Sequence, residues 1–505
     1  MVMGLDCTIP THPARLEDAT MPTHPPHADA PAETALAALW RDAGLPDAPL
    51  AWARLPGQGQ VLPSSFDVAT AAQAGIGAAA LAAAWLWHQR TGQAQQVRVD
   101  RSHATLECSA AFSIDGHVPD LWDKLSGLYA CGADANQPGW VRIHANFAHH
   151  RDAALQVLGL STSPDTERAA VTRALRAWTA AAYEQAAADA GGVVAAARSF
   201  ADWDAHPQAR ALASQPLLAI EPIAGRDAAP RVWPSLSTTP AADAQPLTGL
   251  RVLDLTRILA GPVAGRCLAA HGADVLLVNG PHLPNIAAIA DTSRGKLSTQ
   301  IDLRTDAGRA TLHGLASQAQ VFLQGYRPGA LAHQGFSPEA LAQRHPGIVV
   351  ASLSAYGDNG PWAGRRGFDS LVQTATGFNL AEAAAAGSTT PKAQPVQILD
   401  YTAGHLLAFG IQAALWRQAT QGGSWQVRIT LAGVAAWLRA MGQDAAGLTA
   451  QAPDAGDWME DSVSGFGQGG PGRLRALRHA AWLSATPPRW RRPSMPPGSH
   501  PPRWP

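Results

Sequence analysis

Charge and cysteine are both scarce in this chain. Asp, Glu, Lys and Arg make up 15% of the 505 residues, and 38 basic residues nearly cancel 39 acidic ones. Because no excess of positive charge is available to meet phosphates, a nucleic-acid partner is not expected. The four cysteines form no C-x-x-C pair. This argues against a zinc ribbon or a disulfide framework and favours a reducing, cytoplasmic location.

Long hydrophobic runs are also rare. The first residues lack the basic-then-apolar order of a secretory signal peptide. Residues 68–87 form an uncharged stretch of membrane-spanning length, but Ala and Gly dominate it. Weak hydrophobicity of this kind favours a buried helix that packs through small side chains. We therefore expect no membrane partner.

Composition along the chain predicts its domain organisation. The length exceeds one typical core, so two or more domains are expected. Residues 1–30 are rich in Pro, His and Thr and are predicted to be disordered, and residues 227–249 have the composition of a linker. An α+β domain is expected over 31–226 and an α/β domain over 250–440. The Gly-, Pro- and Arg-rich tail, 441–505, cannot form a long helix.

Two distant segments echo each other. FDVATAAQAGIGAAALAAAWLWHQRTGQAQQVRV begins at Phe66, and LDYTAGHLLAFGIQAALWRQATQGGSWQVRI begins at Leu399. Each contains an Asp, an Ala-rich helix with Trp, a polar turn with Gly, and QVR opening a strand. This indicates an internal duplication, although alanine-rich helices resemble one another by composition alone. Asp67 is then the counterpart of Asp400, and we interpret it as a helix cap.

The richest pattern lies between residues 250 and 437. Apolar runs alternate there with Gly- or Pro-marked turns and Ala/Leu-rich helices, which predicts a Rossmann-like parallel sheet. The run VQIL ends at Asp400, just before a helix. A strand end that opens onto a helix N-terminus suits an ionised carboxylate, and such a group is a candidate covalent nucleophile. The alternative is that Asp400 is an N-cap.

Six motifs in this region point to a family. VLDLTRILAGP, HGADVLLV, SRGKLSTQIDLRT, YRPGAL, YGDNGPWAGRRGFD and DYTAG follow one another in order. Together they resemble the amino-terminal half of the class III CoA-transferases (CaiB/BaiF type), which include formyl-CoA and carnitine CoA-transferases and α-methylacyl-CoA racemase. Residues 60–225 resemble the later part of the same family's chain. The whole therefore resembles a rearranged or fused family member.

The resemblance implies a reaction. Asp400 would carry CoA between an acyl-CoA thioester and a carboxylic acid, through an aspartyl anhydride and an aspartyl-CoA thioester. Coenzyme A is then a substrate, no cofactor is bound permanently, and a homodimer is possible. The alternative is a catalytically degenerate homologue that binds acyl-CoA or a partner protein. An epimerase or acyl-CoA lyase is a third possibility.

The resemblance also implies binding roles for five further residues. Ile258 would line the pantetheine path, and Tyr356 would lie beside the acyl site. The remaining three would contact the nucleotide end of CoA: Arg304 and His333 at its phosphates, and Tyr326 beside its adenine.

Several positions depart from the family pattern. Phe368 stands where the racemase branch has a His, which disfavours two-base racemisation. Asn279 and Gly280 replace a common Glu and a CoA-binding Arg, and Gly325 replaces an Asn. These losses favour the degenerate alternative.

Two groups of charged or polar residues have open roles. Arg294 and Lys296 match a basic motif of the family and either contact CoA or anchor the loop. The histidines at 144, 149 and 150 suggest a metal, but neighbouring histidines in a strand would point to opposite faces. A packing role is favoured for them, and no metal site is predicted.

Overall fold

The computed structural model describes residues 31–224, 228–230, 241 and 243–505. The segment 1–30, which was predicted to be disordered, lies outside the described residues. So do residues 227, 231–240 and 242 of the predicted linker.

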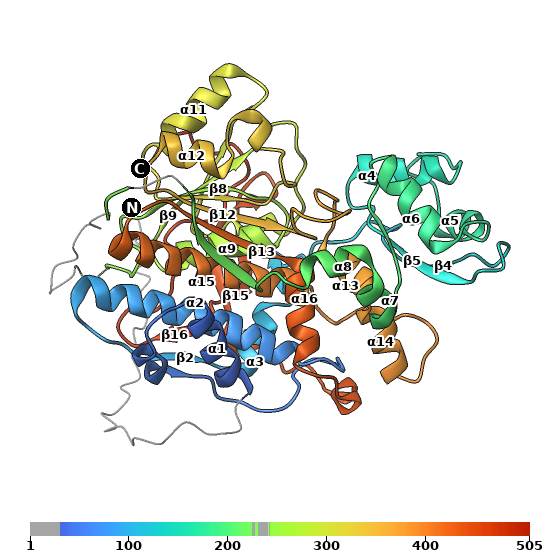
Figure 1. The fold of residues 1–505 in the computed structure, drawn as a ribbon, viewed down its shortest axis with the longest axis horizontal. Helices are drawn as coiled ribbons and strands as arrows, with labels where there is room; N and C mark the ends of the chain where they lie inside the picture. The colour runs from blue at the N-terminus through green and yellow to red at the C-terminus, as the bar shows by residue number, and fades with distance from the viewer. Residues whose placement is uncertain (1–30, 225–227, 231–240, 242) are drawn as a thin grey trace, which may run out of the picture.

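A seven-stranded sheet forms the centre of the molecule (Figure 1). Its order is β10-β9-β8-β11-β12-β13-β7, and neighbours run parallel except for β13 and β7. The first six strands have the doubly wound order expected of a Rossmann-like sheet. The strands are β8 Arg251–Leu255, β9 Asp274–Asn279, β10 Leu297–Gln300, β11 Val321–Gln324, β12 Val349–Ser354, β13 Trp425–Thr430 and β7 Leu218–Pro222.

The mixed α/β architecture confirms the predicted fold class, with one addition. Strand β7 comes from the segment that was expected to form a separate domain. It pairs antiparallel with β13, with Ile220 opposite Val427. The two halves of the chain therefore share this sheet.

Helices cover both faces of the sheet (Figure 1). Alternation along the strands sends Phe322 to one face and its neighbours Val321 and Leu323 to the other. The Phe322 face packs under α11 (Asp306–Ala316) and α12 (Pro338–Arg344). The other face packs against α9 (Ala260–Ala270) and α15 (Ile398–Gln421), with α2 (Val68–Thr91) lying on α15.

Glycine allows α15 to approach α9 closely, because a Cβ at Gly404 of α15 would lie 2.5 Å from the carbonyl oxygen of Ala260 in α9. Helix α2 packs on α15 at ordinary contact distance, since a Cβ at its Gly75 would lie 3.7 Å from the Cβ of His405. Of the described helices, only α2 is long and apolar enough to span a membrane by composition, and 94% of its apolar window is buried inside the fold. The prediction of a buried helix that packs through small residues is confirmed.

The two echoing segments adopt the same succession of elements. Helix α2 leads to β2 (Val97–Val99) and α3 (Arg101–Glu107), and α15 leads to β13 and α16 (Leu431–Ala440). Both long helices have 24 residues. Strand β2 lies in a second sheet of order β1-β2-β16, with β1 at Ala53–Arg54. A common origin of the two segments remains a prediction.

A smaller subdomain lies to one side of the main sheet (Figure 1). It has its own core, which contains Tyr129, Val141 and Tyr183. Helices α7 and α8 then lead back to β7. The elements are β4 Gly127–Cys131, β5 Gly139–Ile143, α4 Ala148–Val157, α5 Arg168–Leu175, α6 Ala180–Asp189, β6 Val194–Ala196, α7 Phe200–Ala205 and α8 Pro207–Leu212.

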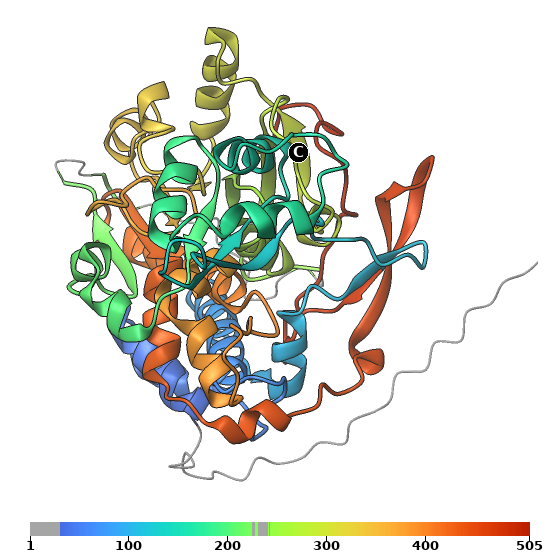
Figure 2. The same ribbon diagram turned by 90° about the vertical axis from the view of Figure 1, so that its right-hand side faces the viewer.

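The carboxyl-terminal segment folds back over the rest of the chain. Strands β14 (Met459–Gly467) and β15 (Gly470–Leu477) form a hairpin that extends with β3 (Phe112–Ile114), and Figure 2 shows it in red projecting from the body. Strand β16 (Ala481–Leu483) then pairs with β2. Further on, the Nε1 of Trp504 donates to the carbonyl of Leu315 at 3.1 Å.

The remaining helices connect these parts. They are α1 Pro31–Asp42, α10 Ile289–Thr292, α13 Asp369–Thr376 and α14 Phe378–Ala385, with short 3-10 turns at Ala48–Trp52, Ala332–Gln334, Ala445–Thr449 and Gly456–Trp458.

Replacing Gly404 with alanine tests the close approach of α15 to α9. The added Cβ meets backbone that cannot rotate away, so we expect a loss of about 1–3 kcal/mol in the free energy of unfolding. Gly314→Ala in α11 is the matched control, because its Cβ would have nothing within 4 Å. That change should be neutral or stabilise by about 0.5–1 kcal/mol. Urea denaturation measures both, and equal effects would contradict the packing argument.

Candidate active site

A cavity of about 320 Å³ opens at the carboxyl edge of the main sheet. It lies at the ends of the paired strands β8 and β11, where the strand order reverses, and this topological switch point is where doubly wound sheets bind ligands. Its walls come from the strand ends, the N-termini of α9 and α15, the loop before α13, and α4 of the small subdomain. The lining includes Phe147, His149, His150, Arg257, Ile258, Leu259, Ala260, Gly325, Tyr326, Arg327, Ser354, Ala355, Arg365, Arg366, Gly367, Phe368 and Asp400.

Asp400 lies in the first turn of α15 and reaches this cavity while only 8% exposed. The expectation of a strand over VQIL is wrong, because the helix itself begins at Ile398. Gln397 is the N-cap, so the alternative that Asp400 caps the helix is also wrong. The carboxylate is therefore a buried first-turn group, a position that the helix dipole favours for an anion.

A second carboxylate, Asp369, lies directly against this turn. It is fully buried at the start of α13, and its Oδ2 accepts the backbone N–H of Asp400 at 2.9 Å. The backbone N–H of Leu399 and the side-chain amide of Gln373 also hydrogen-bond to it. Asp369 thus satisfies the N-terminal amides of α15, and this is its structural role.

The two carboxyl groups alter each other's ionisation. Burial raises the pKa of Asp369 to about 7, against the opposing effect of its hydrogen-bond donors. Burial and then the nearby charge of Asp369 raise the pKa of Asp400 well above its ordinary value. Because the donors surround Asp369, the proton that the pair retains near neutral pH resides on Asp400.

Ile258 lines the cavity in a strained conformation. Its φ is 76°, a left-handed backbone that a β-branched residue rarely adopts and that costs about 1–3 kcal/mol. It stands between the end of β8 and the start of α9. This backbone conformation turns the chain sharply between β8 and α9, so that the first residue of α9, Ala260, lines the cavity.

The two predicted tyrosines occupy different places. Tyr326 lines the cavity, where burial raises the pKa of its phenol and the nearby Arg257 opposes the rise. Tyr356 is buried behind the wall, packed 4.8 Å from the ring of Trp362. A Cβ at Gly367 would lie 3.0 Å from the Tyr356 ring, so Tyr356 supports the lining rather than forming it.

The other two residues proposed for the nucleotide end of CoA lie outside the cavity. Arg304 is exposed beside the start of α11 and pairs with Asp302 at 2.7 Å. His333 is exposed on a 3-10 turn. The structure does not bring either residue to Asp400.

Four arginines at the cavity were not predicted. Arg257, Arg327, Arg365 and Arg366 all line it. Arg365 is engaged by Glu184 and the ring of Trp362, whereas burial and the charge of Arg327 lower the pKa of Arg366. Arginines that repel one another at a cavity mouth favour an anionic ligand. The RRG stretch of the sequence carried this signal.

The histidines of the small subdomain also reach the cavity. His149 and His150 lie in the first turn of α4, not on a strand as expected, and their rings are 4.1 Å apart. His144 stacks on Phe368 with ring centroids 3.9 Å apart. Burial lowers the pKa of His144 and of His150 to about 3, so both imidazoles are neutral.

The basic motif at 294–296 anchors the sheet instead of lining the cavity. The Nζ of Lys296 is fully buried and donates to Asp254 Oδ2 and to the carbonyl of Pro262, both at 2.8 Å. Arg294 is buried and pairs with Asp291 at 2.5 Å. Of the two roles left open by the sequence, the structure supports the anchor.

The counterpart carboxylate, Asp67, lies in a different cavity of about 1060 Å³. Its side chain accepts the N–H of Thr70 as the N-cap of α2 and pairs with Arg101 at 2.6 Å. Its interpretation as a helix cap is confirmed.

Comparison with known proteins relates the second half of the chain to one family. Residues 247–460 match the model for CoA-transferase family III. Over these residues the chain is similar to CoA-transferase family III, whose members use CoA thioesters as substrates.

Individual relatives match parts of the chain. A probable fatty acyl-CoA transferase of Mycobacterium tuberculosis is 35% identical over 211 residues, 39% of this chain and 53% of the relative. An acyl-CoA transferase of Gibberella moniliformis is 30% identical over 371 residues, 66% of this chain and 64% of the relative. A crystal structure of the mycobacterial protein has a TM-score of 0.36 at 36% identity, over 39% of this chain and 57% of that chain. The chain thus spans less than two thirds of each relative's length.

Asp400→Asn tests the burial of the carboxyl pair. A carboxyl whose pKa is raised in the folded protein stabilises the fold while it is protonated. This contribution to the free energy of unfolding is complete below the ordinary carboxyl pKa of about 4 and is lost as the pH rises through the folded-state pKa. Wild-type Tm should therefore fall between pH 5 and pH 8, and Asp400→Asn should reduce that fall. Circular dichroism melts measure it. An unchanged or steeper fall in the variant would show that Asp400 ionises freely in the folded protein.

Proposed function

We propose that this chain transfers CoA from an acyl-CoA to a carboxylic acid, with Asp400 as the covalent carrier. The observation that supports this is the position of Asp400, buried at a helix N-terminus and open to a cavity whose mouth carries four arginines. A cytoplasmic location and a homodimer, both expected from the sequence, belong to the same proposal.

The proposed chemistry begins with attack on the thioester. The ionised Asp400 oxygen adds to the acyl carbonyl and the C–S bond breaks, which leaves a mixed anhydride and CoA thiolate. The thiolate then attacks the Asp400 carbonyl carbon, which releases the donor acid and leaves an aspartyl-CoA thioester. An acceptor carboxylate repeats the sequence in reverse, so CoA moves to the acceptor and Asp400 is regenerated.

The surroundings of Asp400 suit these steps. The reaction needs an ionised nucleophile that is close to the carbonyl and shielded from water. Burial and the charge of Asp369 raise the pKa of Asp400, so its carboxylate, once ionised, is a more basic nucleophile, and the cavity arginines favour anionic substrates. Ile258 and Tyr326 lie at the same cavity, where they would line the path of the CoA arm.

Trapping with hydroxylamine tests the covalent carrier. During turnover with a set of acyl-CoAs and simple acids, an aspartyl thioester should yield a hydroxamate on the peptide that contains Asp400. Asp400→Ala should abolish the label and lower transfer by about 10³-fold or more. Asp67→Ala should retain both, although it should lose more than the ~1 kcal/mol of a cap, because buried Arg101 also loses its partner. Tight CoA binding without any label would support the degenerate binding module instead.

Asp369→Asn tests how the pair controls the nucleophile. Asn retains an acceptor for the α15 amides but removes the neighbouring charge, so the pKa of Asp400 should fall. In the wild type, the pH at which kcat/KM reaches half its maximum should follow the raised pKa of Asp400. In the variant, that pH should be lower by about one unit. A profile that does not move, or moves up, would contradict the assigned role of Asp369.

A second candidate function is proton abstraction α to the thioester, as in an epimerase or lyase. Two imidazoles, His149 and His150, line the cavity and favour it, because imidazole is a common general base. The pKa of about 3 makes His150 a weak base, so the more exposed His149 is the candidate proton acceptor. This activity would appear as α-proton exchange in deuterated solvent without an acceptor acid, and the exchange would be lost in His149→Gln.

A further inference from the structure

A second cluster of reactive side chains lies behind the cavity, away from the substrate. Cys267 and His271 occupy one face of α9, one turn apart, and His479 lies between β15 and β16. All three are buried, with exposures of 1%, 0% and 6%. One ligand atom from each lies within 4.8 Å of the others.

A third histidine adjoins this group. His405 on α15 is 1% exposed, and its ring centroid lies 6.2 Å from that of His479. The rings of His271 and His479 are 5.3 Å apart. Cys267, His271 and His479 therefore form one buried group, and His405 lies at its edge, beside His479.

The imidazole nitrogens of this cluster lack hydrogen-bond partners. Within the described part of the chain, both ring nitrogens of His271, both of His405 and Nε2 of His479 are buried without one. A buried polar atom without a partner costs about 1–3 kcal/mol, so five of them in one place are costly to the fold. Native proteins satisfy nearly all such groups, and their concentration here points to a ligand that the side chains would share.

We propose that Cys267, His271, His405 and His479 bind a structural transition-metal ion, of which zinc fits best. A thiolate with three imidazoles is a donor set that selects zinc over magnesium or calcium. Burial lowers the pKa of His405 and of His479 to about 3, so their rings are neutral, the form in which imidazole binds a metal. Cys267 would lose its proton on binding, as thiols do at zinc.

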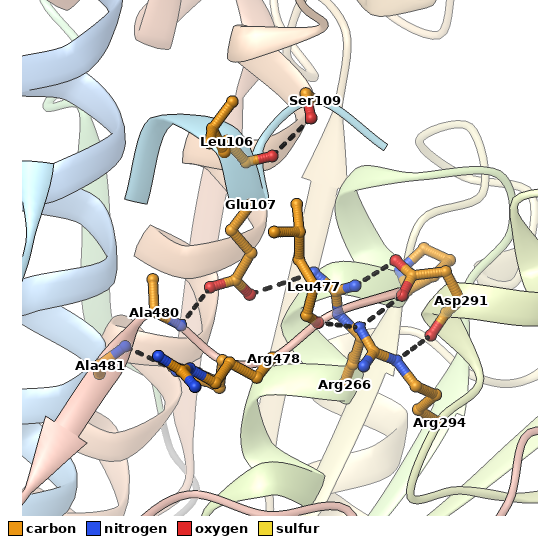
Figure 3. A network of polar contacts seen from close by, with 12 residues as sticks. Leu106, Glu107, Ser109, Arg266, Asp291, Arg294, Leu477, Arg478, Ala480 and Ala481 are labelled. Carbon is orange, nitrogen blue, oxygen red and sulfur yellow. Dashed lines mark hydrogen bonds and ion pairs between the residues drawn. The ribbon is translucent and has the colours of Figure 1, made fainter. Parts of the chain in front are cut away.

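The electrostatics beside the cluster are balanced rather than repulsive. Arg266 is a buried cation close to the histidines, but Glu107 and Asp291 both pair with it (Figure 3). Glu107 also accepts the N–H of Ala480 at 2.7 Å, next to His479, and its charge favours a cation at His271 and His405. A divalent ion bound to a thiolate adds a single net charge to this environment.

Binding requires small adjustments. Zinc bonds of about 2.3 Å to sulfur and about 2.0–2.1 Å to nitrogen place ligand atoms about 3.3–3.7 Å apart. Cys267, His271 and His479 must therefore move inward by about 1 Å, and His405, which lies outside their group, must move further. His479 Nδ1 accepts the N–H of Ala481 at 3.1 Å, and that hydrogen bond is lost if the metal binds Nδ1 or if Nδ1 takes the proton. One hydrogen bond is small against the binding free energy of a structural zinc site.

The site would link three parts of the fold. Helix α9 and helix α15 both begin at the cavity that contains Asp400, and the segment around His479 leads into β16. A metal would fasten the carboxyl-terminal segment to both helices. The proposal concerns stability and does not depend on CoA transfer.

Metal analysis of the full-length protein tests this proposal. Protein expressed with added zinc, freed of any histidine tag and dialysed, should contain about one zinc per chain by inductively coupled plasma mass spectrometry. Cys267→Ser and His405→Asn should each reduce the content at least about tenfold, consistent with loss of one ligand of four. Cys131→Ser is the matched control, because Cys131 is a buried cysteine of the small subdomain. It should retain full zinc content.

Cobalt substitution gives a readout that does not rely on any variant. Wild-type protein loaded with Co²⁺ should show visible bands of a tetrahedral site and a near-ultraviolet thiolate charge-transfer band. Removal of the metal with a strong chelator should lower Tm in the wild type and in Cys131→Ser. Zinc content below about a tenth of an ion per wild-type chain, or a cobalt spectrum without the thiolate band, would overturn the proposal.

Discussion

The close contact among α2, α15 and α9 is the constraint on which the rest of the structure depends. Gly404 lets α15 meet the backbone of α9, and a Cβ at Gly410 would lie 2.7 Å from Val427 of the sheet. Helices this close leave no room for ordinary side chains, so their relative position is fixed to within a fraction of an ångström. Helix α9 begins at Ala260, and Asp400 lies in the first turn of α15; both residues line the cavity. The same contact therefore sets the distance between the two helix N-termini that a substrate would meet.

A second fixed point holds the sheet to α9. The buried pair Lys296–Asp254 joins β8 to the turn before β10, and a Cβ at Gly265 would lie 2.2 Å from the Asp254 carboxylate. Removal of one partner from such a pair leaves the other charge unpaired in a nonpolar interior. The stability lost in this way is far larger than the net stability that the intact pair contributes. The charged groups of this protein are thus divided between two tasks. One set locks the scaffold, and the other places four arginines, of which Arg365 pairs with Glu184, around a cavity that favours anions.

Sequence patterns predicted those parts of the site that follow directly from local order. Ile258, Tyr326 and Asp400 each follow a motif at the end of a strand or the start of a helix, and all three line the cavity. Asp369 was missed, and His150 was assigned only a packing role, because their neighbours come from other elements, which no local pattern reveals. The expected strand before Asp400 was wrong because VQIL is a short apolar run. Such a run is buried in the same way at the start of a core helix as in a strand, so its pattern cannot separate the two. Arg304 matched a motif, yet the fold leaves it in solvent.

The pairing of β16 with β2 has a consequence for biosynthesis. Val97 and Leu483 are partners in one small sheet, although almost four hundred positions separate them along the polypeptide. A nascent chain emerging from the ribosome can assemble the central sheet early, but the β1-β2 edge must wait for residues 481–483 before it gains its neighbour. Until then its unpaired backbone is exposed to other chains. The long sequence separation makes closure of this edge slow, which lengthens the time during which it can pair wrongly.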